Sequence, residues 1–138
     1  MSQISIDKFN HLIASELPST AQSGIYLRDI SPGKAEMVLP YSDHLLRPGG
    51  TIAGPFMMQL ADVCMYAVVL SMIGEVKLAV TTNLNINFLR KPADSDLVAV
   101  GSIIKMGKRL AVVEVSIFSD EAIVAHTTGT YSIPPQAD

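Results

Sequence analysis

The sequence has little of what disulfide-bonded, metal-binding or nucleic-acid-binding proteins need. Cys64 is the only cysteine, which excludes both an intrachain disulfide framework and a cysteine metal cluster. The three histidines are scattered without metal-ligand spacing, so we expect no metal and no bound cofactor. Ten basic residues against 13 acidic ones leave a net charge of −3, which argues against a nucleic-acid partner. The first 17 residues lack the basic start and apolar core of a signal peptide, so we expect a cytoplasmic protein.

Charged residues are also scarce. They make up 17% of the 138 residues, against about a quarter in typical soluble domains. Hydrophobic residues reach 49%, and this length fits one domain spanning residues 1–138 with a substantial core. The shortage of charge indicates that part of the surface is covered by other copies of the chain. We therefore expect a homodimer or a homotetramer.

What the chain does have is one long apolar run, from Ala53 to Gly74, with a single formal charge at Asp62. The run is long enough to cross a membrane. However, it contains Gln59 and Asp62 and has neither an aromatic belt nor a basic bias at its flanks, so we predict a buried helix and no membrane. Gln59 and Tyr66 share a helix face with Asp62. A buried carboxylate is expensive, so Asp62 is either paired with a cation such as Arg47 or kept for chemistry; we favour chemistry.

The remaining patterns predict one more helix and six strands. Residues 5–17 have apolar side chains at helical spacing, and Pro18 is expected to end that helix. Residues 78–90 alternate, with Val80, Leu84, Ile86 and Phe88 on the expected buried face. The other expected strands are residues 25–31, 34–39, 97–106, 109–118 and 123–133, several of them joined by short turns. This order predicts an α+β fold in which an antiparallel sheet curls around one long hydrophobic helix.

The segments LLRPGGTIAGPFMMQLADV (residues 45–63) and AVTTNLNINFLRKP (residues 79–92) resemble a known family. They are similar to the hotdog-fold acyl-CoA thioesterases of the phenylacetate-degradation (PaaI-like) type. The similarity continues through a Gly-Lys-Arg turn at residues 107–109 and a Thr-Gly-Thr strand at residues 128–130. The resemblance implies the hotdog fold, with the sheet wrapped around the central helix.

The resemblance also implies an acyl-CoA thioesterase, which releases a free acid and coenzyme A. Asp62 falls on the family's catalytic acid and would act as general base or as nucleophile. Gly54 falls on the glycine whose backbone N–H, at a helix N-terminus, helps form the oxyanion hole. Thr81 falls on a strand hydroxyl near the acid, and Gln59 is a further candidate for positioning water or the carboxylate. Gly54 and Asp62 lie about 12 Å apart along one helix, so the implied site combines two subunits.

Three positions depart from the family pattern: Arg47 replaces an asparagine, Ala53 a histidine and Pro55 a second glycine. These departures keep open an alternative function, a non-catalytic acyl-CoA-binding hotdog protein. A hotdog hydratase or dehydratase is a third possibility, but residues 63–66 offer no histidine beside the acid. The substrate-binding candidates are the cations suited to coenzyme A phosphates and one tyrosine near the acid, namely Arg47, Arg90, Lys108, Arg109 and Tyr66.

Overall fold

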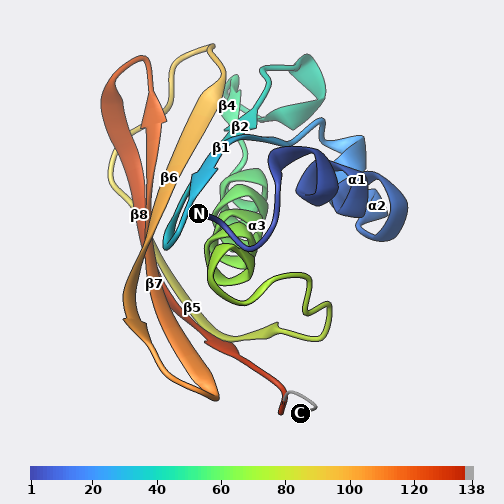
Figure 1. The fold of residues 1–138 in the computed structure, drawn as a ribbon. Helices are drawn as coiled ribbons and strands as arrows, with labels where there is room; N and C mark the ends of the chain where they lie inside the picture. The colour runs from blue at the N-terminus through green and yellow to red at the C-terminus, as the bar shows by residue number, and fades with distance from the viewer. Residues whose placement is uncertain (136–138) are drawn as a thin grey trace.

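The computed structural model describes residues 1–135 as a curved sheet with one long helix in its concave face (Figure 1). Six strands form an antiparallel sheet in the order β1-β2-β6-β7-β8-β5. A separate ribbon of two short strands, β3 and β4, precedes the long helix α3. The strands are β1 (Tyr26–Ser31), β2 (Lys34–Leu39), β3 (Leu46–Arg47), β4 (Thr51–Ile52), β5 (Val80–Phe88), β6 (Leu97–Met106), β7 (Leu110–Ser119) and β8 (Ala122–Ser132).

Helix α3 (Gly54–Ile73) is the centre of the core, and its bounds match the predicted helix. Ala53 is its N-cap, Pro55 lies in its first turn, and Gly74 ends it with φ 85°, a backbone conformation that suits glycine. By length and composition α3 could cross a membrane, but most of its side chains pack inside the protein. The buried core helix of a protein can have the same length and composition. The packing of α3 therefore agrees with the predicted buried helix.

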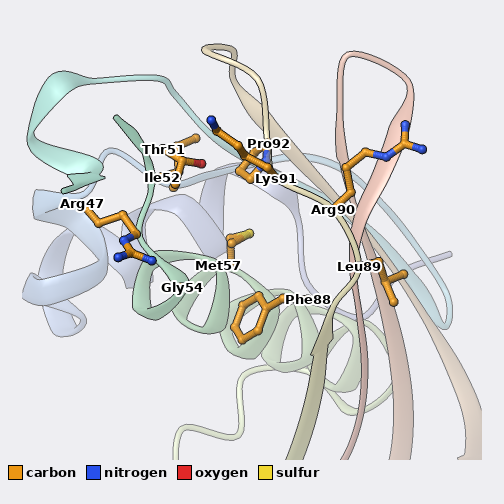
Figure 2. A pocket seen from close by; sticks show the side chains of 10 residues that line it. All are labelled: Arg47, Thr51, Ile52, Gly54, Met57, Phe88, Leu89, Arg90, Lys91 and Pro92. Carbon is orange, nitrogen blue, oxygen red and sulfur yellow. The ribbon is translucent and has the colours of Figure 1, made fainter. Parts of the chain in front are cut away.

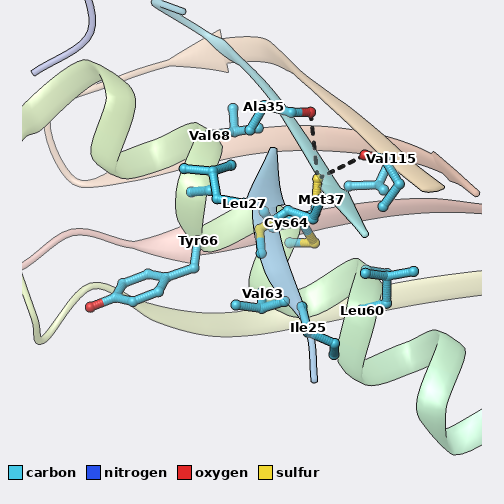
Figure 3. Packing of buried hydrophobic residues seen from close by; sticks show 14 of the residues in the cluster. Ile25, Leu27, Ala35, Met37, Leu60, Val63, Cys64, Tyr66, Val68 and Val115 are labelled. Carbon is cyan, nitrogen blue, oxygen red and sulfur yellow. Dashed lines mark hydrogen bonds between the residues drawn. The ribbon is translucent and has the colours of Figure 1, made fainter. Parts of the chain in front are cut away.

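Glycines in the sheet let α3 approach the strands closely. A Cβ atom on Gly101 of β6 would lie 2.9 Å from the Cys64 sulfur, and one on Gly129 of β8 would overlap Met65. The Cys64 thiol lies 3.7 Å from the carbonyl oxygen of Ala35 and 3.9 Å from that of Ala99, among the buried side chains of Figure 3. Burial raises the pKa of this thiol, and Cys64 packs as a small core residue.

The N-terminal segment lies on the side of α3 away from the sheet (Figure 1). Helix α1 (Ile6–Glu16) starts after Ser5, whose side chain accepts the N–H of Lys8. Pro18 ends α1, as predicted, but it also begins a second short helix, α2 (Pro18–Gln22), that was not predicted. Proline suits the first helical turn because its missing N–H needs no partner there.

Strand β5 corrects one detail of the predicted burial. Leu84 and Ile86 pack against the core, but Val80 and Phe88 are half exposed, because β5 is an edge strand. A bulge between Thr81 and Asn83 interrupts its pairing with β8 and changes which side chains face inwards. The fold is nevertheless the predicted α+β hotdog arrangement, with an antiparallel sheet around one central helix.

Candidate active site

The carboxylate of Asp62 is held by two hydroxyl groups. Thr81 donates its hydroxyl to Asp62 Oδ1 at 2.5 Å. The Tyr131 hydroxyl lies 3.3 Å from the same oxygen and 3.1 Å from the Asp62 main-chain oxygen. Among residues 1–135 no hydrogen bond reaches the second carboxylate oxygen, Oδ2. Asp62 is half-buried and lines a cavity, and within the described residues only one of its carboxylate oxygens is held by hydrogen bonds.

The bulge in β5 explains how Thr81 reaches the acid. Strict alternation would place Thr81 on the face opposite to Leu84, together with Asn83 and Asn85. The extra residue at the bulge turns both Thr81 and Leu84 towards α3. The resemblance had placed Thr81 near the acid, and the structure brings the two side chains together.

Tyr131 is a functional candidate that the sequence analysis missed. It lies on β8, is 4% exposed, and stacks on Tyr66 with ring centroids 6.0 Å apart. Burial and the negative charge of Asp62 raise the pKa of Tyr131, so its hydroxyl stays protonated and can donate. No local signal marks it, because a tyrosine at an inward position of a strand is also an ordinary core residue.

Gln59 and Tyr66 lie beside Asp62 but bond to other partners. The Gln59 amide donates to Ser19 Oγ at 2.9 Å and accepts from the Ser23 hydroxyl at 2.9 Å, so it ties α3 to α2 and the residue that caps it. The Tyr66 hydroxyl donates to the Lys77 carbonyl at 3.3 Å. Both side chains line a cavity of about 190 Å³ that also includes Asp62 and Tyr131.

A second cavity, of about 450 Å³, lies at the N-terminus of α3 and includes Gly54, Arg47 and Arg90 (Figure 2). The Arg47 side chain lies beside the start of α3. The Arg90 side chain lies at the far side of the cavity and points away from Arg47. Lys91 and the ring of Phe88 also line this cavity. Within the described residues, none of its three cations pairs with a carboxylate.

The N-terminus of α3 offers one free backbone donor at this cavity. Pro55 has no N–H, and the N–H of Phe56 bonds to the Ala53 carbonyl at 3.1 Å. The N–H of Gly54 finds no acceptor in the described part of the chain. A Cβ atom at position 54 would lie 3.2 Å from the Phe88 ring, so glycine also leaves room at this point.

The remaining candidates lie elsewhere. Lys108 and Arg109 line a cavity of about 480 Å³ beside Ile73, at the C-terminal end of α3 and so far from Arg47 and Arg90. Arg47 and Asp62 line different cavities and form no ion pair, so the alternative in which Arg47 neutralises Asp62 is not seen within this chain. No group of His, Cys, Asp or Glu side chains that could hold a metal occurs in residues 1–135.

Comparisons with known proteins agree with the family and the fold. The model of a family described as "Thioesterase superfamily" matches residues 49–125. A Silicibacter sp. TM1040 protein, titled "putative thioesterase", has 38% sequence identity and a TM-score of 0.88, with 98% of this chain and 95% of that chain covered. "Putative esterase Ta0293" of Thermoplasma acidophilum is 30% identical over 105 residues, which are 75% of this chain and 79% of that protein.

A point mutant of the phenylacetic acid degradation protein PaaI from Thermus thermophilus shares the fold. Its TM-score is 0.77 at 22% identity, with 85% of this chain and 99% of that chain covered. The family match includes Gly54, Asp62 and Thr81 and ends before Tyr131. The hydroxyl that completes the support of the acid therefore lies outside the matched range.

Proposed function

Since the chain belongs to the thioesterase superfamily, we propose that it hydrolyses acyl-CoA thioesters to a free acid and coenzyme A. The observation that carries the proposal is the half-buried Asp62 carboxylate, with Oδ1 held by Thr81 and Tyr131 and Oδ2 unbonded within the described residues. A carboxylate fixed at one oxygen can use the other to take a proton from water or to attack the thioester carbon.

Two routes are open to Asp62. As general base it takes a proton from a water molecule, whose oxygen attacks the carbonyl carbon, and coenzyme A leaves as the thiol. As nucleophile its oxygen attacks that carbon and displaces coenzyme A, and water then hydrolyses the resulting anhydride. In both routes negative charge develops on the carbonyl oxygen, which the free N–H of Gly54 would stabilise.

The proposed site needs two chains. Gly54 and Asp62 line separate cavities and stand eight residues apart, about 12 Å along the helix. One helix cannot direct both groups at one carbonyl, so Gly54 of one chain would serve Asp62 of the other. An edge strand supports such a pairing: β5 ends the sheet, and Val80 and Phe88 are about half exposed along it.

The cavity at the helix N-terminus suits the phosphates of coenzyme A. Arg47, Arg90 and Lys91 line it without a carboxylate partner in residues 1–135, and charge-assisted hydrogen bonds to phosphate are strong. Lys108 and Arg109 lie too far from this cavity to take part in the same chain. They would contact coenzyme A only from a second chain.

The alternative is an acyl-CoA-binding protein without hydrolysis. It is favoured by the reduced set of donors at the start of α3, where Pro55 has no N–H and Phe56 donates to Ala53. Such a protein would still bind acyl-CoA through the two cavities. Steady release of coenzyme A thiol by the unmodified protein separates the two functions.

Asp62→Asn tests the proposed role directly. The amide has nearly the same size but cannot take a proton from water or attack a carbonyl carbon, so we expect thiol release to fall about 10²–10⁴-fold. The melting temperature should stay close to that of the unmodified protein. Asp94→Asn, at an exposed acid outside both cavities, is the matched control and should keep full turnover. Wild-type turnover in Asp62→Asn would exclude Asp62 as the catalytic acid.

A further inference from the structure

Among residues 1–135, strand β5 pairs with β8 alone and leaves its other edge free for a second copy of the chain. We propose that two β5 strands pair antiparallel with Asn85 on the two-fold axis, so that the partner's Phe88 lies opposite Thr81. This inference deepens the proposed function, on whose two-chain site it rests, because it specifies the register that brings the partner's Gly54 to Asp62.

The two faces of β5 differ in a way that restricts its pairing. Leu84 and Ile86 pack towards α3, whereas three asparagines are exposed on the opposite face, namely Asn83, Asn85 and Asn87. Directly opposite residues of an antiparallel pair lie on the same face of the sheet. In a continuous sheet the asparagines therefore pair with one another, and the axis must pass through a residue and not between two.

The backbone groups of β5 agree with an axis at Asn85. The N–H of Leu89 bonds to the Val124 carbonyl in β8 at 2.8 Å. Since backbone groups alternate in direction along a strand, those of Asn85 also point to β8, and those of Leu84 and Ile86 point to the free edge. With Asn85 on the axis, Leu84 of each chain would exchange its backbone hydrogen bonds with the partner's Ile86.

The bulge in β5 decides what lies opposite Thr81. Thr82 is the extra residue, which β8 leaves unpaired. When the partner strand also skips Thr82, an axis at Asn85 places the partner's Phe88 opposite Thr81. An axis at residue 84 or 86 would instead place the partner's residue 86 or 90 there.

The pair of Thr81 with the partner's Phe88 joins the two halves of the proposed site. Thr81 donates to the Asp62 carboxylate at 2.5 Å. The Phe88 ring covers Gly54, where an added Cβ atom would lie 3.2 Å from it. Two strand residues that each touch one half of the site would thus become neighbours across the axis. The partner's Gly54 would lie on the same side of the sheet as Asp62.

Exposed apolar side chains support the same register independently of the site. Val80 is 51% exposed and Leu89 is 55% exposed, and both lie on the sheet face opposite to Thr81 and Phe88. An axis at Asn85 places Val80 opposite the partner's Leu89, so two such contacts would cover four apolar side chains. An axis at residue 84 or 86 would place the polar residue 87 or 91 of the partner opposite Val80.

Disulfide cross-linking tests the register. Cys64 is the only native cysteine and is fully buried, so an introduced cysteine reacts without competition. On the axis the two copies of residue 85 form a pair without backbone bonds, whose Cα atoms lie about 4.5 Å apart, a separation that a disulfide spans. Asn85→Cys should therefore give a covalent dimer on a non-reducing gel. Asn83→Cys alone is the matched control and should not, since its two copies would lie about 13 Å apart.

Mixed chains distinguish the neighbouring registers. Co-refolded Asn83→Cys and Asn87→Cys chains should cross-link to each other, because residue 83 lies opposite residue 87 of the partner. Linked peptides are identified by mass spectrometry. A link between residues 83 and 85 would place the axis at residue 84, and one between 85 and 87 would place it at residue 86. Either link would overturn the register, and no link in any mixture would overturn the β5 pairing itself.

A substitution at Val80 tests the contact with the partner's Leu89. Val80→Asp puts a charge into this contact twice in each dimer and should weaken dimerisation at least about tenfold in analytical ultracentrifugation. Leu110→Asp is the control, because Leu110 is 54% exposed on the same sheet face but lies on β7, away from the edge. Equal weakening by both variants would assign the effect to charge and overturn the contact.

The cross-links form without turnover, which keeps the register separate from the thioesterase proposal. The oxidised Asn85→Cys dimer should release thiol at the same rate as its reduced form. The expected cross-links in a protein that releases no thiol would support the register and reject the hydrolase. Thiol release that stops on oxidation would show that the active dimer pairs in another register, and would overturn this one while the hydrolase stands.

Discussion

A single carboxylate oxygen with two hydroxyl donors is the most informative detail at the residue scale. Thr81 and Tyr131 come from the two neighbouring strands β5 and β8, and both donate to Oδ1 of Asp62. Such an arrangement orients the second oxygen and limits rotation of the carboxylate. Tyr131 can play this part at any ordinary pH, because burial and the Asp62 charge raise the pKa of its hydroxyl.

Tyr131→Phe should therefore lower catalysis without changing the fold. The ring and its stacking on Tyr66 remain, and only the hydroxyl beside Asp62 is lost. A hydrogen bond to a charged group contributes about 1.5–3 kcal/mol, and at 3.3 Å we expect the lower end, or roughly a tenfold fall in kcat. KM should change little, since the hydroxyl acts on the acid.

Tyr66→Phe is the matched control for this substitution. It removes a hydroxyl from the partner ring of the same stack, but that hydroxyl bonds to the Lys77 carbonyl and not to Asp62. It should keep kcat within about twofold. Equal losses in the two variants would assign the effect to packing of the tyrosine pair, and the positioning role of Tyr131 would be wrong.

At the scale of elements, hairpin turns show how the chain fixes strand pairing. Asp120 and Glu121 form the two-residue link between β7 and β8, and both have positive φ, at 48° and 74°. Two left-handed residues are the geometry of a type I′ turn, for which Asn-Gly is preferred. The sequence predicted a turn here, and the structure adds that Glu121 occupies the position where glycine is favoured.

Glu121→Gly should stabilise the protein. Left-handed backbone costs a residue with a Cβ atom about 1 kcal/mol, and glycine avoids that cost. For a chain of this size, the gain corresponds to a rise in melting temperature of about 4 °C by calorimetry. Glu121→Ala keeps the Cβ atom and should not raise the melting temperature. If alanine stabilised as much as glycine, loss of charge rather than backbone strain would be the cause.

The elements also show where sequence reasoning succeeds and where it stops. Helix α3 was predictable to within one residue at each end, because its apolar run has Pro55 in the first turn and Gly74 at its end. The bulge between Thr81 and Asn83 was not predictable, because an extra residue in one strand shows only when that strand is paired with its neighbour. Helix α2 was missed because proline signals both the end of one helix and the start of another.

The same distinction applies to the candidate site. Asp62 was predictable because a lone charge in a buried helix needs a reason. Gln59 was chosen for sharing its helix face, and the structure shows that its amide is occupied by Ser19 and Ser23. Those partners are about 40 residues away in the chain, and no local pattern predicts such a contact. The same holds for Tyr131, 69 residues from Asp62.

At the scale of the whole molecule, the separation of Gly54 from Asp62 becomes a prediction about assembly. If the active site combines two chains, two different inactive variants should restore each other when mixed. Asp62→Asn removes the acid. Gly54→Pro removes the backbone donor, and the backbone suits it because Ala53 already has φ −70° and ψ 140°, which the residue before a proline prefers. The added Cβ atom would lie 3.2 Å from the Phe88 ring, so this half-exposed side chain must shift slightly.

Each variant alone should lose at least about 10²-fold in thiol release. In a mixed dimer, one site combines the intact Gly54 of the Asp62→Asn chain with the intact Asp62 of the Gly54→Pro chain, and the other site lacks both groups. Random pairing makes half of the dimers mixed, so co-refolded chains should recover about one quarter of wild-type turnover, measured against each variant refolded alone. If both groups acted within one chain, every site would lack one of them. Thiol release by the mixture would then equal the average of the two variants refolded alone.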